Sequence, residues 1–260
     1  MIGGNSISGL LTGASIRAFQ QNAAGLAKSS ERLATGQRIN RASDDPAGLV
    51  TSENLRAVLA FLDAETRSTQ RSDQVIATAD SALGEVSDMV RRAEALEVAN
   101  ANGAGLSDVE RAANQMEIDQ IHESVNRALG SSSFNGQTLF DGSHKVSASG
   151  GESVSVEALS LGALGDTSEE RIQTLRDFRT KINTTRGELG AFSKNVIGAQ
   201  TNNIATVIEN LSSAKSMIRD ADYAKETARS ARFGVLTRAS LKALSFLKSS
   251  AGNDVLRLLG

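Results

Sequence analysis

The sequence contains no cysteine and no tryptophan, one tyrosine, and a single proline, Pro46, in 260 residues. Without cysteine the chain has neither disulfides nor thiolate metal sites. Aromatic residues make up only 3% of the chain, so a compact core built on large rings is not expected. The 40% of hydrophobic residues are instead mainly Ala, Leu, Ile and Val, a composition that suits long packed helices.

Long apolar runs are also missing. No stretch reaches the ~18 apolar residues that a membrane-spanning helix needs. The first 16 residues carry no charge, but they lack the basic region that begins a secretory signal. We interpret them as mature protein and expect that an exported chain leaves without a cleaved hydrophobic signal.

Motifs of catalysis are absent as well. There is no phosphate-loop glycine pattern and no Gly-x-Ser-x-Gly elbow, and His122 and His144 lack the spacing of metal ligands. The adjacent acids Asp44 and Asp45 fit helix capping better than acid–base chemistry. The sequence therefore predicts no enzyme activity, no metal and no cofactor.

The charge is unevenly distributed. Residues 1–41 and residues 221–260 each carry a net charge of +4, so the middle of the chain carries −10 within a total of −2. Basic ends are one mark of nucleic-acid binding, but stacking aromatics are scarce and no DNA- or RNA-binding motif is present. We interpret the charges as solvated helix faces.

Apolar residues that recur every seven positions predict two long helices with a coiled-coil seam. The first row, interrupted only by Thr69, is Leu55, Leu62, Ile76, Leu83 and Val90. The second row is Leu175, Ile182, Leu189 and Val196, after which the apolar stripe moves to Ile197, Ile204, Ile208 and Leu211. Such a drift is expected where a helix changes neighbours.

Two shorter elements are predicted between these helices. Ser107 and Glu110 form a capping-box pattern at the start of a helix over 107–129. The stretch KVSASGGESVSVEAL alternates apolar and polar residues on both sides of two glycines, which indicates a β-hairpin within about 134–165. A lone hairpin is unstable, so we expect it to lie on the helices.

Both ends of the chain are amphipathic. The expected fold is mainly α: a long antiparallel helical or coiled-coil bundle with paired terminal helices (1–42 and 221–260), a rod domain (43–220) and a small β-hairpin. We expect the two ends to pack on each other and then on other molecules. The apolar residues predicted to drive this assembly are Ile7, Leu10, Leu11, Ala14, Leu26, Leu33, Leu236, Leu241, Leu244, Leu247, Leu258 and Leu259.

A joint is predicted in the stretch LATGQRINRASDDPAGL. Gly36 suits the left-handed position that closes the first helix. Asp45 is placed to cap the next helix, Pro46 fits its first turn, and Asp44 with Asp45 is expected to face the positive end of its dipole. The joint would separate a terminal helix from the long central one.

At this point the sequence resembles the bacterial flagellins. The resemblance rests on SSERLATGQRINRASDDPAGL, ALGEVSDMVRRAEAL, SSFNGQTLFDG and NLSSAKSMIRDADYAKETARSARFGVL, which occur in the order of that family. It implies a minimal flagellin without outer domains, a secreted subunit that polymerises into the extracellular flagellar filament for motility. Its implied partners are other copies of itself, the type III export apparatus and a chaperone, and the filament cap and junction proteins.

The resemblance also implies a contact with a host innate immune receptor. Arg92, Leu96 and Glu117 match the family's contact positions, whereas Glu94 and Glu97 replace the basic or neutral residues more usual in strongly stimulatory members. The alternative is that these are ordinary surface and seam residues of a helix.

The C-terminal stretch LKALSFLKSSAGNDVLRLLG departs from the family, which often has a Gln-rich segment with a proline there. With Arg238, Lys242 and Lys248, it predicts an unusually basic inner layer. Two other functions stay open: an adaptor of the hook–filament junction, which does not polymerise indefinitely, and a secreted coiled-coil adhesin or scaffold. Self-polymerisation distinguishes the filament subunit from the adaptor.

Overall fold

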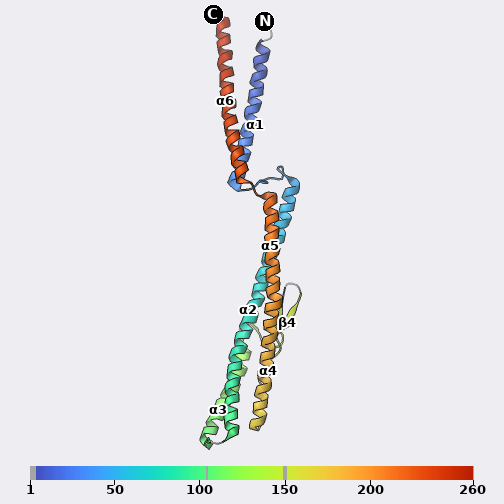
Figure 1. Cartoon of the computed structure of the whole chain (residues 1–260), viewed down its shortest axis with the longest axis vertical. Coiled ribbons are helices and arrows are strands. Elements are labelled where there is room, and N and C mark those ends of the chain that lie inside the picture. The colour runs from blue at the N-terminus through green and yellow to red at the C-terminus, as the bar shows by residue number, and fades with distance from the viewer. Residues whose placement is uncertain (1–3, 104, 149–150, 260) are drawn as a thin grey trace. The chain divides into compact units, whose positions relative to one another are not determined.

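The computed structural model describes the backbone of residues 4–103, 105–148 and 151–259, and the side chains of residues 11–103, 105–148 and 151–249. The chain divides into two compact units, residues 1–59 with 209–260 and residues 60–208. Each unit is helical, which confirms the expected mainly α fold with long helices (Figure 1).

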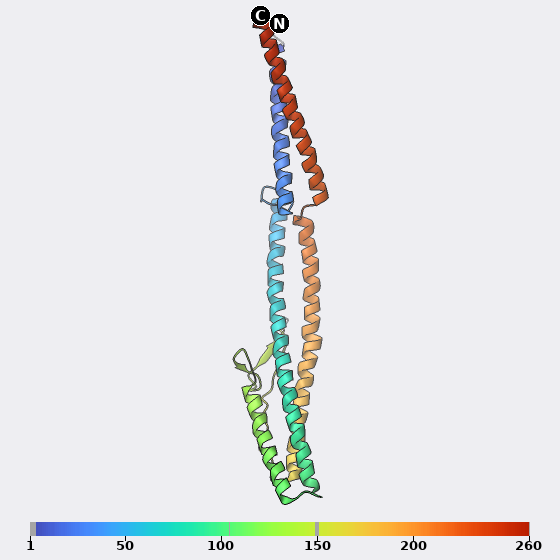
Figure 2. The ribbon, with the colours of Figure 1, turned by 90° about the vertical axis from the view of Figure 1, so that its left-hand side faces the viewer.

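The first unit contains the terminal helices α1 (Gly4–Thr35) and α6 (Tyr223–Leu259), the start of α2 (Pro46–Asn102) and the end of α5 (Gly198–Arg219). α1 and α6 lie side by side in both views (Figures 1 and 2). Half-buried and buried positions recur along both helices at alternating spacings of three and four residues, the pattern of a coiled-coil seam. In α1 these are Thr12, Ser15, Phe19, Asn22, Leu26, Ser29 and Leu33, and in α6 Glu226, Ser230, Phe233, Thr237, Ser240, Leu244 and Leu247.

The second unit is built around the seam between α2 and α4 (Ser168–Phe192). In the predicted rows Ile76, Leu83 and Val90 of α2, and Leu175, Ile182 and Leu189 of α4, are buried in one core cluster. Thr69, the polar residue of the first row, is also buried, and its hydroxyl donates to the backbone oxygen of Glu65 at 3.0 Å. The predicted coiled-coil seam is confirmed over these residues.

The prediction fails at Val196, which is only half-buried, while its neighbour Ile197 is buried. A π-helical turn, η1 (Ser193–Ile197), lies between α4 and α5. A π-turn inserts one extra residue into the helix, so the step from Leu189 to the next buried position is eight residues instead of seven. The repeat then resumes through Ile204 and Leu211, so the stripe drifts because of a local insertion.

The segment between α3 (Asp108–Ser131) and α4 forms two small hairpins. The predicted hairpin is confirmed: β3 (Lys145–Ser147) pairs antiparallel with β4 (Ser153–Ser155), with Val146 opposite Val154. A second hairpin, β1 (Ser133–Phe134) with β2 (Gln137–Thr138), was not expected. It turns through Asn135 and Gly136, both at positive φ, as an Asn-Gly turn requires.

The hairpins lie against the helices through buried residues and a few specific bonds. Leu139, Phe140, Val146 and Val156 join the core cluster of α2 and α4. Asn126 of α3 donates to the backbone oxygen of Leu161 at 3.0 Å and accepts from its N–H at 2.9 Å. The amide of Asn126 forms the two hydrogen bonds that the backbone of a neighbouring strand would form, and it thereby holds the loop that leads to α4.

Capping motifs define where α3 and α4 begin. The predicted box at Ser107 and Glu110 is confirmed, with both reciprocal hydrogen bonds present. Thr167 and Glu170 form an equivalent box before α4. Within the part of the chain that the structure describes, no helix combines the length and the apolar character that crossing a membrane requires.

Candidate assembly surface

The predicted apolar residues of the terminal helices fall into two groups. Leu26, Leu33, Leu244 and Leu247 lie in the seam between α1 and α6, where they are half-buried. Leu11, Ala14, Leu236 and Leu241 are exposed on the outside of the pair. The side chains of Ile7, Leu10, Leu258 and Leu259 lie outside the described residues.

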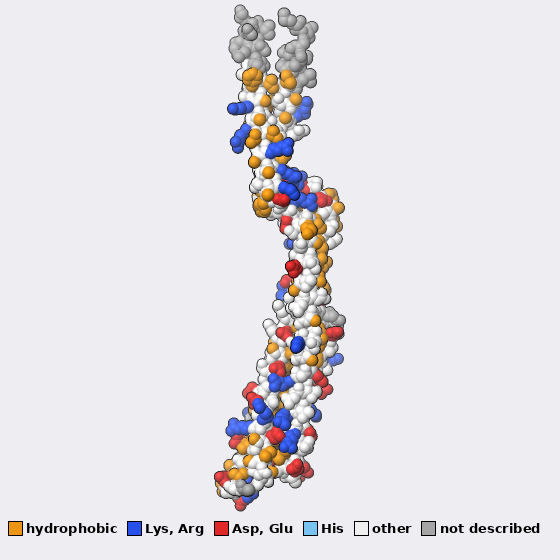
Figure 3. Space-filling view, viewed as in Figure 1, with side chains coloured by type: hydrophobic (Ala, Val, Ile, Leu, Met, Phe, Trp, Pro, Cys, Tyr) orange, Lys and Arg blue, Asp and Glu red, His pale blue; other side chains and the backbone are white. Residues whose placement is uncertain are grey.

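The outer surface holds further apolar side chains that the sequence analysis did not single out. Phe246 is 71% exposed and Val235 is 63% exposed, compared with 51% for Leu11 and 50% for Leu241. Figure 3 shows hydrophobic side chains along this helix pair with Lys and Arg side chains between them. The seam itself contains several Ser, Thr and Asn residues, so much of the apolar surface of the pair is left uncovered.

The two helices approach closely at Gly25. A Cβ atom built there would lie 2.8 Å from two ring atoms of Phe233, closer than real Cβ atoms come to their neighbours. Asn22 donates to the hydroxyl of Ser240 at 3.2 Å one turn away. Gly25 therefore provides the space in which the ring of Phe233 packs against α1.

Gly25→Leu is expected to raise the critical concentration for polymerisation by about 10- to 100-fold. Overpacking costs about 1–3 kcal/mol, and about 1.4 kcal/mol corresponds to a factor of ten. Gly13→Leu is the control, because a Cβ there meets nothing within 4 Å and both changes gain helix propensity. Sedimentation of the polymer measures the critical concentration of both variants. If Phe233→Ala fails to restore assembly of Gly25→Leu, steric overlap is not the cause.

A carboxylate is buried in the same seam. Glu226 is 3% exposed, and its Oε1 accepts from Arg32 at 3.1 Å and from Arg229 at 2.8 Å. Burial by itself would raise the pKa of Glu226, but hydrogen bonds from Ser29, Arg32 and Arg229 outweigh it and lower the pKa. The carboxylate is therefore ionised and ties the two helices together near their junction with the rest of the unit.

The helical chain breaks at the residues of the predicted joint. α1 ends at Thr35, Gly36 adopts a left-handed conformation with φ +70, and α2 begins at Pro46. Asp45 caps α2 as predicted, because its Oδ1 accepts from the N–H of Gly48 at 2.9 Å. A second break, between α5 and α6, lies beside this one.

Backbone bonds join the two breaks. Gln37 and Asp220 form an antiparallel bridge. The N–H of Arg38 donates to the oxygen of Arg219 at 2.7 Å, and the N–H of Ala221 donates to the oxygen of Gly36 at 2.9 Å. Both chain segments therefore change direction at one place that their own main chains hold together.

Asp44 bonds to the loop before α2 and to α1. Its carboxylate accepts from the N–H groups of Asn40 and Arg41 and lies 2.7 Å from the Nζ of Lys28. The hydrogen bond from Lys28, followed by that from Asn40, lowers the pKa of Asp44 to about 2. The loop thus folds back onto α1 around this one carboxylate.

Asp44→Asn is expected to lower the midpoint of thermal unfolding at pH 7, with the difference disappearing in acid. The folded pKa of about 2 is below the reference value of 3.8, so the stabilisation is complete above pH 3.8 and is lost as the pH falls through about 2. Circular dichroism melts across this range measure it. Asp63→Asn, in an exposed pair with Arg67, is the control. A difference that stays constant down to pH 2 would contradict this electrostatic origin.

Two of the three residues that the sequence predicts to contact an immune receptor, Arg92 and Glu117, line a groove between α2 and α3. Arg92 and Glu117 form an ion pair at 2.5 Å, with side chains 71% and 37% exposed, and both line the groove of about 590 Å³. Leu96 is half-buried on α2. The structure brings Arg92 and Glu117 together from two helices, which their spacing in the sequence does not reveal.

Glu94 and Glu97, the two departures from the stimulatory pattern, are bonded to α4. Glu94 pairs with Arg176 at 2.9 Å and Arg179 at 3.3 Å. Glu97 is 0% exposed and pairs with Arg171 at 3.1 Å. It lies seven residues after Val90 and so continues the seam with a charge, a signal that the sequence analysis did not use.

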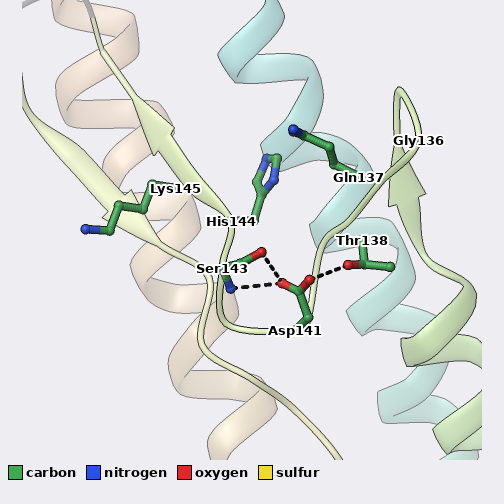
Figure 4. A pocket seen from close by; sticks show the side chains of 7 residues that line it. All are labelled: Gly136, Gln137, Thr138, Asp141, Ser143, His144 and Lys145. Carbon is green, nitrogen blue, oxygen red and sulfur yellow. Dashed lines mark hydrogen bonds between the residues drawn. The ribbon is translucent and has the colours of Figure 1, made fainter.

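A pocket beside the hairpins is lined by a turn that its own hydrogen bonds stabilise (Figure 4). It has a volume of about 480 Å³. Asp141 accepts from the hydroxyl of Thr138 and from the hydroxyl and N–H of Ser143, which lower its pKa to about 2. His122 bonds elsewhere, with Nε2 2.9 Å from the oxygen of Gly162. Among the described residues, no three His, Cys, Asp or Glu side chains are placed to hold a metal ion.

The fold and these surfaces define a helical structural protein with apolar side chains on the outside of a terminal helix pair. The family described as the bacterial flagellin N-terminal helical region matches residues 11–145, and the flagellin C-terminal helical region matches residues 172–259. The chain therefore belongs to the bacterial flagellin family, whose members are structural subunits of the flagellar filament.

Two relatives compared by sequence agree with this assignment. The chain is 30% identical to the flagellar filament 30.7 kDa core protein of Treponema maltophilum, over 88% of this chain and 90% of that protein. It is 33% identical to a flagellin of Halalkalibacterium halodurans, over 82% and 84%. The crystal structure of Bacillus cereus flagellin matches 56% of this chain and 88% of that one, with 22% identity and a TM-score of 0.42.

Proposed function

We propose that this flagellin polymerises through the outside of its paired terminal helices, residues 1–42 and 221–260, and that these pairs form the inner layer of the filament. The observation that carries the proposal is the apolar surface left on the pair: Leu11, Leu241 and Phe246 are at least half exposed although α1 and α6 already contact each other. Exposed apolar surface of this kind marks sites of association. Residues 43–220 form the rod of the next layer.

A head-to-tail contact that repeats without closure produces a filament. The joint at Gly36, Asp44, Asp45 and Pro46 holds the terminal pair to the rod in each subunit. The entropy cost of ordering the terminal helices is offset by the contacts that neighbouring subunits supply. Assembly in this scheme needs no catalytic residue.

The export route and the partners are proposed as well, and membership of the family supports them. The chain is exported unfolded by the flagellar type III apparatus with a chaperone, and is added beneath the filament cap next to the junction proteins. A chain without cysteine has nothing to mispair on this route. Its final location is the extracellular filament.

Seeded polymerisation of the purified full chain, followed by electron microscopy, tests the proposal. Long uniform filaments are expected, growing from the added seeds. A chain that stays monomeric under every seeding condition would place it instead with the junction adaptors, which do not polymerise indefinitely. A chain that associates only into short coiled-coil assemblies would support the scaffold interpretation.

A second role is proposed for Arg92, Leu96 and Glu117, the contact of monomers with a host innate immune receptor. The observation in favour is the exposed Arg92–Glu117 pair beside the groove between α2 and α3. A cell reporter assay is expected to respond to wild-type monomer and to lose that response in Arg92→Ala. No response to the wild-type monomer removes the proposal.

The basic C-terminal segment is proposed to give the filament a positively charged channel. Arg238, Lys242 and Lys248 are all exposed, and none of them forms an ion pair among the described residues. A map of the filament in which all three lie against acidic partners would exclude this.

A further inference from the structure

A pocket of about 260 Å³ lies between α1 and α6, beside the contact of Gly25 with Phe233. Its charged lining is entirely basic: Lys28, Arg32, Arg229 and Arg232. The basic residues of each helix that line it are spaced three or four apart, so each pair shares one helical face. The pocket is therefore a property of the paired helices and exists only where α1 and α6 are together.

The positive charges of this pocket exceed the acids that neutralise them. Arg32 and Arg229 share the single buried carboxylate of Glu226, and Lys28 pairs with Asp44. Arg232 forms no ion pair among the described residues. The Nε of Arg32 and the Oε2 of Glu226 are both buried without a hydrogen-bond partner. Two carboxylates thus face four cations, and the guanidinium of Arg232 is the group without an acidic partner. Such groups bind oxyanions through strong charge-assisted hydrogen bonds.

The surroundings of the pocket add to this excess. α1 has three basic residues and one acidic residue, and α6 has seven basic and two acidic, in a chain whose total charge is −2. The rest of the chain is consequently acidic. A field of one sign raises the local concentration of counter-ions, and the acidic remainder of a second copy carries the complementary charge.

From these observations we infer that the pocket, called here the α1–α6 anion pocket, binds an oxyanion through Arg232, Arg32 and Lys28. The oxyanion has two possible sources, a carboxylate of a second copy of this chain or a free anion such as sulfate or phosphate. Only the first source rests on the proposed polymerisation. Either one neutralises the excess charge and stabilises the helix pair.

The test uses the full chain, as monomer and as filament, with sulfate exchanged for chloride at constant ionic strength. The wild-type melting midpoint by circular dichroism is expected to rise along a saturating curve. Arg232→Gln is expected to weaken the apparent affinity about tenfold, the effect of losing one hydrogen bond between charged groups. Arg238→Gln is the matched control, since Arg238 is exposed on the same helix and does not line the pocket. Sulfate also stabilises proteins because it is excluded from their surface. That effect would raise the melting midpoints of the wild type, Arg232→Gln and Arg238→Gln by the same amount and without saturation.

The critical concentration in chloride distinguishes the two sources. A carboxylate from a second copy predicts that Arg232→Gln polymerises about tenfold less readily than Arg238→Gln even without sulfate, because one charge-assisted contact is lost. A free anion predicts a difference only when sulfate is present. The inference is overturned if Arg232→Gln behaves like Arg238→Gln in both measurements. If the wild-type chain forms no filaments, the proposed function fails. The pocket is still decided in the monomer by the helicity that sulfate adds, because an anion that binds only the paired helices raises the population of that pair in the wild-type chain more than in Arg232→Gln.

Discussion

A chain that lacks residues 1–32 and 233–260 is expected to remain monomeric with seeds and at concentrations at which the full chain forms filaments. The deletion removes most of α1 and α6, and with them the exposed side chains of Leu11, Leu241 and Phe246. Burying one large apolar side chain contributes about 1.5–3 kcal/mol. Because Leu11 and Leu241 are about half exposed and Phe246 is 71% exposed, burying their remaining surface contributes about 2.5–5 kcal/mol. This corresponds to a rise of roughly 100-fold to several thousand-fold in critical concentration, since about 1.4 kcal/mol is a factor of ten.

The deletion leaves the second unit, residues 60–208, with its own core. The melting transition of that unit is therefore expected to persist in the trimmed chain, which serves as the control for folding. Sedimentation and electron microscopy measure assembly, and removing each end separately shows whether both are needed. Filaments from the trimmed chain would mean that the rod alone carries the contacts between subunits. The role proposed for α1 and α6 would then be wrong.

The long helices were predictable because the residues that they bury repeat at a regular spacing in the sequence. Leu83 and Leu175 each belong to a row of apolar residues that recurs every seven positions, and most residues of these rows are buried between the helices. The prediction failed where the phase changes within one helix. A fixed seven-residue register leads from Leu189 to Val196, whereas the π-turn moves burial to Ile197. The eight-residue step was visible in the sequence but was attributed to a change of neighbour.

The surface of the terminal helices was predicted less completely. The seam of the pair contains polar residues such as Asn22 and Ser240, so apolar character did not separate the seam from the outside. Leu11 and Leu26 were both assigned to the apolar face of the first helix, and the structure places Leu26 in the seam and Leu11 outside it. Amphipathicity shows that a helix has an apolar stripe, but it does not show which part of a wide stripe packs in the seam and which part faces outward.

Contacts between residues far apart in the chain could not be predicted from the sequence. Asp44 is next to a helix start, yet its partner Lys28 lies on the preceding helix. Arg92 meets Glu117, and Glu97 meets Arg171, across gaps that no local pattern specifies. The position of Glu97 within an apolar seam already indicated that its charge has a buried partner. Only the structure identifies that partner as Arg171.

Arg171→Ala is expected to lower the free energy of unfolding of the second unit by about 3–5 kcal/mol, the cost of leaving a buried charge without its partner. Arg171 is 20% exposed, and its guanidinium pairs with the fully buried Glu97. It also bonds to Gln115 of α3, to the oxygen of Gly165 at 2.8 Å and to the oxygen of Asp166 at 3.1 Å. One side chain therefore joins α2, α3 and the loop before α4.

Urea unfolding followed by circular dichroism measures this loss. In a unit of this size the loss corresponds to a fall of roughly 6–20 °C in the melting midpoint. Arg176→Ala provides the matched control, because Arg176 lies on the same helix and pairs with Glu94, but its side chain is 49% exposed. Exposed pairs contribute about 0–1 kcal/mol, so its effect should be several-fold smaller.

The double variant Glu97→Met with Arg171→Met separates the ion pair from the desolvated charge. Replacing both members of a buried pair by apolar residues is often neutral or stabilising, so the double variant is expected to regain most of the stability that Arg171→Ala loses. If the double variant is as unstable as the single one, the bonds from Arg171 to Gln115, Gly165 and Asp166 carry the stability instead. If Arg171→Ala costs no more than Arg176→Ala, the carboxylate of Glu97 is not left buried and charged when its partner is removed.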